Sequence, residues 1–292
     1  MGFSITNEDL NSLKNLNQKT RFILMECGNQ YIKDMTYSLF EKESVSPVEV
    51  LSGLDEIWTL PHYEKNISYM KTYYKNEKVT IVPYLWQSDF VDYQIKDSNY
   101  IAKEKSPHSK KNKSILVMEP NLNSSKNCIL PLYIVESFEL RFPNVLDSCN
   151  LLCAYKLADN KYFIKLILQL NIYKNRVNFL KVHERKTLIE AIHNLGSIVI
   201  SHQQDNALNN LYFDVLYLGL PLLHNSNIIS DYGYFYPENN IDEAVKQLEF
   251  ILNNHKEDFP RYKKQTDKLL NLYSPKSEKN MKSYYDLILN IN

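Results

Sequence analysis

Apolar residues along the chain gather in short runs, and a segment with helical periodicity follows most of them. The stretch 197–226 shows this pattern clearly, because its β-branched run at 197–201 is typical of a buried parallel strand. Apolar side chains then recur three and four residues apart over residues 207–218, which predicts a helix with one apolar face. Gly219 is placed to end that helix before the next apolar pair begins a strand. The stretch therefore predicts a strand, a polar loop, a helix and a second strand.

The same alternation of strand and helix runs through both halves of the chain, as expected for parallel sheets covered by helices. The predicted strands are residues 21–25, 54–58, 79–82, 115–118, 151–154, 177–180, 197–201 and 222–223, with a loop or last strand at 231–237. The predicted helices are residues 7–18, 31–41, 61–74, 127–140, 161–170, 184–195, 207–218, 241–252, 259–273 and 276–291.

The two series are separated by a polar and basic stretch that contains KEKSPHSKKNKS. We expect residues 96–113 to be a linker, with a hinge near residues 92–114. Residues 1–95 are predicted to form a small N-terminal Rossmann-like domain, and residues 114–292 a C-terminal Rossmann-like domain with closing helices. A chain of 292 residues is long enough for two domains. The predicted fold class is therefore α/β, with two facing units and a cleft.

The composition is that of an ordinary soluble protein with no net charge. The 34 basic and 34 acidic residues balance, which argues against a generic nucleic-acid binder. No apolar run approaches the ~20 residues of a membrane span, and the first residues lack the apolar core of a signal peptide. The four cysteines form no CxxC pair, so we expect reduced thiols and a cytoplasmic location.

Two polar stretches follow predicted strands, at the edge where open α/β sheets bind ligands. The first, residues 119–126, combines Asn and Ser side chains with Lys126 just before a helix, a combination that favours phosphate. A helix cap with a surface lysine explains the same residues. The second, residues 202–206, lies where a helix dipole favours anions. The usual nucleotide motifs, GxGxxG and GxxxxGK[ST], are absent.

The second stretch leads into Asp214, which lies among apolar positions where a purely solvated charge is less expected. In a helix that already includes Asn206, the side chains of Asn206, Asn210 and Asp214 would follow one line. The eight residues from Asn206 to Asp214 would then span about 12 Å. That span fits a ligand laid along the helix.

These residues resemble a known segment. The stretch 201–226 is similar to the donor-site segment of GT-B glycosyltransferases, with Asn206 and Asp214 at its two acidic positions. Over roughly residues 20–250 the chain has a closer resemblance to the GT-B-like DUF2827 family. The shared strings are CGNQY at 27–31, IWTLPHY at 57–63, PYLW at 83–86, EPN at 119–121 with Lys126 following, SHQQDNALNNLYFD at 201–214 and YGYFYP at 232–237.

The resemblance implies a metal-independent hexosyl- or pentosyltransferase that moves a sugar from a nucleotide-sugar donor, such as a UDP- or GDP-sugar, to a glycan or glycoprotein acceptor. No other cofactor and no nucleic-acid partner is implied. The resemblance places the ribose hydroxyls at Asp214, the donor sugar at Asn206 and the diphosphate at Lys126. The remaining residues of the expected donor site are Glu119, Asn121, Gln203 and Tyr232.

Two departures from the family pattern keep other functions open. Asn206 is not acidic, and the N-terminal domain, which carries the acceptor site in GT-B enzymes, is small or truncated here. A nucleotide- or glycan-binding module without transfer activity is therefore the alternative, and a structural α/β protein is a further one. If the reaction inverts the sugar, a base is needed. His62 and His202 are the candidates because imidazole titrates near neutral pH, although either can equally be structural.

Overall fold

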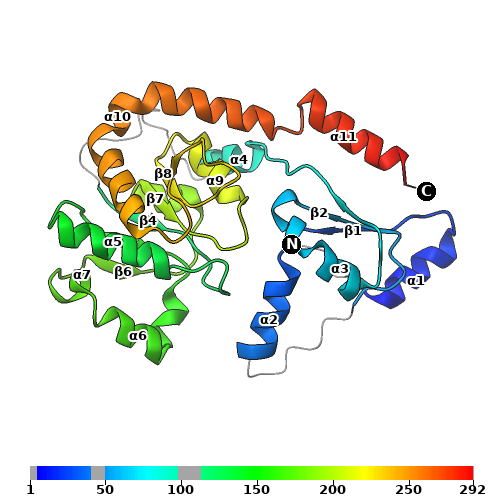
Figure 1. The fold of residues 1–292 in the computed structure, drawn as a ribbon, viewed down its shortest axis with the longest axis horizontal. Coiled ribbons are helices and arrows are strands. Elements are labelled where there is room, and N and C mark those ends of the chain that lie inside the picture. Colours follow the sequence, from blue (N-terminus) through cyan, green and yellow to red (C-terminus); the bar gives the residue numbers. More distant parts are fainter. Residues whose placement is uncertain (1–4, 41–49, 98–112, 292) are drawn as a thin grey trace. The chain divides into compact units, whose positions relative to one another are not determined.

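The computed structural model describes residues 5–40, 50–97 and 113–291, and most of the predicted linker lies outside these ranges (Figure 1). The chain forms two compact units. Unit 1 comprises Met1–Leu85 and Pro275–Asn292, and unit 2 comprises Trp86–Ser274.

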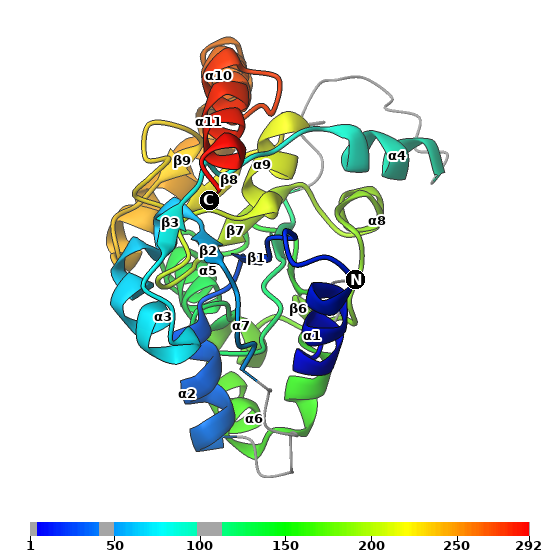
Figure 2. The same cartoon turned by 90° about the vertical axis from the view of Figure 1, so that its right-hand side faces the viewer.

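Unit 1 is built on a three-stranded parallel sheet with the order β1-β2-β3. These strands are Ile23–Glu26, Glu56–Thr59 and Val79–Ile81. Its helices are α1 (Asn7–Leu16), α2 (Gln30–Phe40), the 3-10 helix η1 (Pro61–Asn66), α3 (Ile67–Tyr74) and α11 (Glu278–Leu289). Helix α3 packs against β3 (Figure 2), and Ile57, Met70 and Val82 are fully buried in the core of this unit.

Unit 2 holds a six-stranded parallel sheet with the order β6-β5-β4-β7-β8-β9. Its strands are β4 (Ile115–Val117), β5 (Cys149–Leu151), β6 (Leu180–Val182), β7 (Ile198–Ser201), β8 (Leu222–His224) and β9 (Tyr234–Phe235). Its helices are α4 (Asp89–Asp97), α5 (Ile129–Arg141), η2 (Tyr155–Asp159), α6 (Lys161–Ile167), α7 (Asn171–Lys174), α8 (Leu188–Asn194), α9 (Asn210–Tyr217) and α10 (Ile241–Leu272).

The strand order of unit 2 places its first strand, β4, beside its fourth, β7. The chain therefore winds outward in opposite directions from this pair, which is the doubly wound Rossmann-like topology. Strands β4, β7 and β8 are buried along their whole length, which explains their nearly unbroken apolar sequences. Helix α10 packs against α5, β8 and β9 (Figure 1). The α/β fold class predicted from the sequence is confirmed.

Helix α9 begins three residues later than the periodicity predicts. Asn209 is its N-cap, and the Asn209 side chain accepts a hydrogen bond from the amide of Leu211 at 2.7 Å. Asn206 therefore lies in the preceding loop, and the predicted line of Asn206, Asn210 and Asp214 along one helix is wrong. The predicted stop at Gly219 is confirmed, because this residue follows the helix with a φ of 70°.

The end of unit 2 also differs from the prediction, because residues 241–252 and 259–273 belong to one helix, α10, with Pro260 inside it. Buried side chains continue at helical spacing on both sides of Pro260, from Leu248 to Leu269. This packed face maintains the helix across a residue that normally interrupts one. Strands β5 and β6 are shifted from their predicted ranges by about two residues, and α4 and α7 were not predicted.

The boundaries of the two units lie elsewhere than predicted. Residues from Trp86 to Asp97 belong to unit 2, where Tyr217 donates a hydrogen bond to Asp92 on α4 at 2.9 Å. Helix α11 belongs to unit 1, because Tyr284 donates to the carbonyl of Pro83 at 2.8 Å and its ring lies edge-on to Trp58.

Candidate functional site

The loops that leave β4 and β7 meet at the point where the strand order of unit 2 reverses. Lys126 and Gln203 form an antiparallel bridge, and the amide of Gln204 donates to the carbonyl of Ser125 at 2.9 Å. The 119–128 and 202–209 loops are therefore joined through their backbones. Open α/β sheets bind ligands at this position, so both predicted polar stretches lie where a ligand is expected.

Glu119 is a fully buried ionisable residue of this site, with none of its surface exposed. Its carboxylate accepts hydrogen bonds from the Ser201 hydroxyl and from Nε2 of Gln203, the latter at 3.2 Å. Burial raises the pKa of Glu119 to about 7, against the opposing effects of the Ser201 bond and the Lys126 charge. Glu119 is thus a buried acceptor that holds the side chains of Ser201, at the end of β7, and Gln203, in the second loop.

Lys126 carries the positive charge of the site and is half-buried. Burial lowers the pKa of its ammonium group, while the carboxylate of Glu119 acts in the opposite direction. Lys126 takes part in none of the ion pairs within 4.0 Å among the described residues. Its charge is therefore available to an anionic ligand rather than committed to one protein carboxylate.

Gln203 is held by hydrogen bonds with three other residues. Asn225, which directly follows β8, accepts from the Gln203 amide and donates to the Gln203 carbonyl, both at 2.9 Å. The side-chain oxygen of Gln203 accepts a hydrogen bond from Asn206, which is buried. The ends of three neighbouring strands, β4, β7 and β8, are thereby connected through one glutamine. Asn225 was not among the site residues expected from the sequence, where its only signal is a polar residue directly after a predicted strand.

Asn121 acts inside the first loop and not at its surface. Its side chain donates to the carbonyls of Glu119 at 2.9 Å and Leu152 at 3.2 Å, and it accepts from the amide of Cys128 at 2.8 Å. The amide of Ile129 donates in the same way to the side-chain oxygen of Asn127, at 3.1 Å. Two backbone amides at the start of α5 are therefore already engaged by the protein, and Lys126 is the cation of this loop.

His202 lies beside Tyr236, with its Nδ1 atom 3.1 Å from the tyrosine hydroxyl. Burial lowers the pKa of His202 to about 4, so the ring is neutral at neutral pH. Tyr232 contributes its backbone to the neighbouring loop, because its carbonyl accepts from Nε2 of His224 at 2.7 Å. His202 thus lies in the second loop, and the hydrogen bond from His224 holds the 232–237 segment next to β8.

Asp214 lies on α9 and is partly buried. Its Oδ1 atom accepts a hydrogen bond from Nε1 of Trp86 at 2.8 Å. Burial raises the pKa of Asp214 to about 6, and the bond from Trp86 opposes this shift. The other carboxylate oxygen, Oδ2, has no hydrogen-bond partner among the described residues, so it can accept from a ligand.

His62, the other candidate base, belongs to unit 1. It follows β2 in the 3-10 helix η1, and its ring centroid lies 4.0 Å from that of Tyr63 and 6.0 Å from that of Tyr84. This aromatic setting lies at the carboxyl end of β2, where the loops of a parallel sheet gather.

The fold described above is that of GT-B glycosyltransferases. The structure of TarM is similar, with a TM-score of 0.53 and 14% sequence identity over 91% of this chain, which spans 54% of TarM. OtsA, a trehalose-6-phosphate synthase, gives a TM-score of 0.57 and 9% identity over 98% of this chain and 74% of that one. Anabaena Alr3699/HepE, solved in complex with UDP-glucose, gives a TM-score of 0.55 and 8% sequence identity. The match covers 97% of this chain and 77% of HepE. At these identities the likeness establishes the fold.

The chain itself belongs to the DUF2827 family, described as a protein of unknown function, whose pattern matches residues 1–288. No curated protein sequence matches it. All four cysteines are free thiols in this structure. In the described ranges, none of the helices combines the length and apolar character needed to cross a membrane.

Proposed function

We propose that this protein is a GT-B glycosyltransferase that transfers a hexosyl or pentosyl group from a nucleotide-sugar donor to a glycan or glycoprotein acceptor in the cytoplasm. The observation that supports it most is Lys126, a half-buried cation at the reversal point of the six-stranded sheet, with no carboxylate committed to it. The departing nucleoside diphosphate of such a reaction develops negative charge, which a fixed cation stabilises without a bound metal.

The donor is proposed to lie along the second loop and α9. Lys126 would bind the diphosphate, and the free Oδ2 atom of Asp214 would accept a ribose hydroxyl. Asn206 is proposed to lie next to the donor sugar, buried and bonded to Gln203. Glu119, Asn121 and Gln203 would then be positioning residues, because each is engaged with the protein.

The base remains a choice between His62 and His202. A general base works best when its pKa is near the working pH, and the pKa of His202 is about 4. His202 therefore suits a neutral hydrogen-bonding role better than proton abstraction. We retain His62 of unit 1 as a candidate base if the reaction inverts.

The alternative function is a nucleotide- or glycan-binding module without transfer activity. It is favoured by the three-stranded sheet of unit 1 and by Asn206 at a position that is acidic in the GT-B pattern. A thermal-shift panel of UDP, GDP, CMP and dTDP and their sugars tests both functions. A ligand at 100 times its Kd should stabilise the fold by about 2.7 kcal/mol. Donor turnover then separates the transferase from the binding module.

A further inference from the structure

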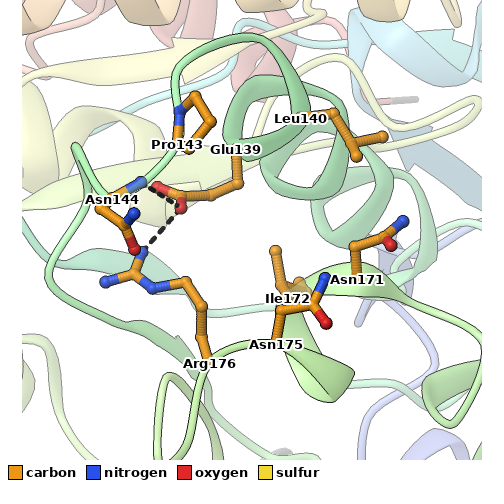
Figure 3. A pocket seen from close by; sticks show the side chains of 8 residues that line it. All are labelled: Glu139, Leu140, Pro143, Asn144, Asn171, Ile172, Asn175 and Arg176. Carbon is orange, nitrogen blue, oxygen red and sulfur yellow. Dashed lines mark hydrogen bonds and ion pairs between the residues drawn. The ribbon is translucent and has the colours of Figure 1, made fainter.

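One cavity of unit 2 lies at the far end of α5 from Lys126 and is lined in part by Glu139 and Arg176 (Figure 3). Glu139 accepts hydrogen bonds from the amides of Asn144 and Leu146 and from Arg176, at 3.1, 3.0 and 2.7 Å. The volume of this cavity, about 240 Å³, is below the ~300–1,000 Å³ of most ligand pockets. These contacts attach the end of α5 to the segment before β6, and they explain the charged pair as structural.

A second cavity, of about 480 Å³, lies between the start of α5 and the η2–α6 segment. It is within the usual size range of small-molecule sites. Three asparagines and two tyrosines line it beside an aliphatic and phenylalanine surface; these polar residues are Asn121, Asn127, Asn160, Tyr133 and Tyr162. No acidic or basic side chain lines this cavity. A charged ligand would therefore lose its hydration there without gaining a partner of opposite charge.

The polar groups of this cavity divide into engaged and available ones. The amides of Asn121 and Asn127 hold the first turn of α5, as described above. Asn160 uses only its oxygen, which accepts from the amides of Tyr162 and Phe163 at 3.0 Å each to cap α6. Its Nδ2 group has no hydrogen-bond partner among the described residues. The cavity therefore offers one amide donor and the hydroxyls of Tyr133 and Tyr162.

Both tyrosines leave much of their rings uncovered at this cavity. Tyr162 is 79% exposed and Tyr133 is 37% exposed, whereas Phe163 is buried. An exposed aromatic ring with a polar tip favours ligands that have an apolar face and a hydroxyl-bearing edge. Neutral sugars have both.

We propose that this cavity binds a neutral pyranose ring, in addition to the nucleotide sugar proposed at Lys126. The C–H face of the ring packs against Tyr162 or Tyr133, and the sugar hydroxyls bond to Asn160 and to the tyrosine hydroxyls. This second site retains a sugar unit of a glycan on unit 2, independently of whether the chain transfers one.

The test is ligand-observed NMR of the full chain with the methyl glycosides of glucose, galactose, mannose and N-acetylglucosamine, and with uridine. At least one glycoside should show saturable binding, and Tyr162→Ala should weaken it about tenfold. Tyr162→Phe should retain most of the binding, because it keeps the ring. Tyr173→Ala is the matched control, since Tyr173 is an exposed tyrosine of the same unit outside the cavity, and it should have no effect.

Failure of all four glycosides to bind would overturn the proposal. So would glycoside binding that Tyr162→Ala leaves intact, because the sugar would then lie elsewhere. Uridine binding that is lost in Tyr162→Ala, without glycoside binding, would make the cavity a nucleobase site and would also overturn it.

Discussion

Nε1 of Trp86 donates a 2.8 Å hydrogen bond to Oδ1 of Asp214, across 128 residues of sequence. The Trp86 ring also lies 6.0 Å from Phe213 and 5.5 Å from Tyr217, measured between ring centroids. The first residue of unit 2 is thus packed onto α9. One carboxylate oxygen of Asp214 is bonded to Trp86 and the other has no partner among the described residues. Substitution of Asp214 is therefore expected to have one effect on stability and a separate effect on ligand binding.

The first effect is on stability. Burial raises the pKa of Asp214 from 3.8 to about 6, so the folded chain holds a proton more tightly than the unfolded chain between these values. The stabilisation from this protonation is complete below about pH 3.8 and is lost as the pH rises through about 6. Asp214→Asn should remove that dependence and should be as stable as wild type, or more stable by on the order of 1–2 kcal/mol, at pH 7. Urea unfolding at pH 4–7 measures it. If the free energy of unfolding changes with pH in the same way in both proteins, burial does not raise the pKa of Asp214.

The second effect is on binding. Asp214→Asn should cost about 1–3 kcal/mol of affinity for nucleotides with an intact ribose, because an amide oxygen carries no charge. The loss should be much smaller for analogues without the 2′- and 3′-hydroxyls. Calorimetric titration of both ligand types, on protein whose melting temperature is measured in parallel, is the appropriate experiment. Equal losses for ribose and dideoxyribose ligands would remove Asp214 from the donor site.

Lys126→Ala should weaken nucleoside diphosphate binding by roughly tenfold or more while the fold remains intact. A hydrogen bond to a charged group contributes about 1.5–3 kcal/mol, and the half-buried ammonium of Lys126 is not committed to a protein carboxylate. Lys174→Ala, which removes an exposed lysine of the same unit, is the control for a general loss of charge. If both variants bind UDP and GDP as wild type does, Lys126 is not a diphosphate ligand.

His224 predicts a pH dependence of the opposite sign. Its Nε2 atom donates to the Tyr232 carbonyl and its Nδ1 atom accepts from the Ser226 amide, so the buried ring is neutral. Burial lowers the pKa of His224 to about 4. Its contribution to stability is present at neutral pH and is lost as the pH falls from about 6.5 to about 4. His224→Gln should therefore destabilise by about 1–3 kcal/mol at pH 7, and by less towards pH 4. If the difference in free energy of unfolding between wild type and His224→Gln is the same at pH 4 and pH 7, the His224 ring is not held in its neutral form.

The sequence predicted the elements whose pattern is local. The apolar runs that form β4 and β7 were predicted to within a residue. Gly219 follows the end of α9 as expected, because it adopts the left-handed backbone conformation that glycine favours. The start of α9 was missed because Asn206 and Asn209 are equally good caps, and tertiary bonds decide between them. Asn206 is drawn into the bond with Gln203, so Asn209 remains to cap the helix.

The missed parts of the site depend on contacts between distant residues. Asn225 positions Gln203 from the next strand, and Trp86 engages Asp214 from the start of the unit. No periodicity or spacing indicates either pair. The loop residue Asn121 was correctly placed at the strand exit, but only the structure shows that its amide is used by the protein.

The proposed function requires that the chain turn over a nucleotide sugar at Lys126. The most direct measurement is the release of nucleoside diphosphate from UDP-, GDP- and dTDP-sugars, by wild type and by Lys126→Ala, with the acceptor omitted and then supplied as a mixed glycan pool. Wild type should release diphosphate from at least one donor, the acceptor should stimulate this release, and Lys126→Ala should reduce it about tenfold or more. Tight binding of a nucleotide sugar without any release of diphosphate, at any acceptor concentration, would contradict the proposed function and would establish the binding module instead.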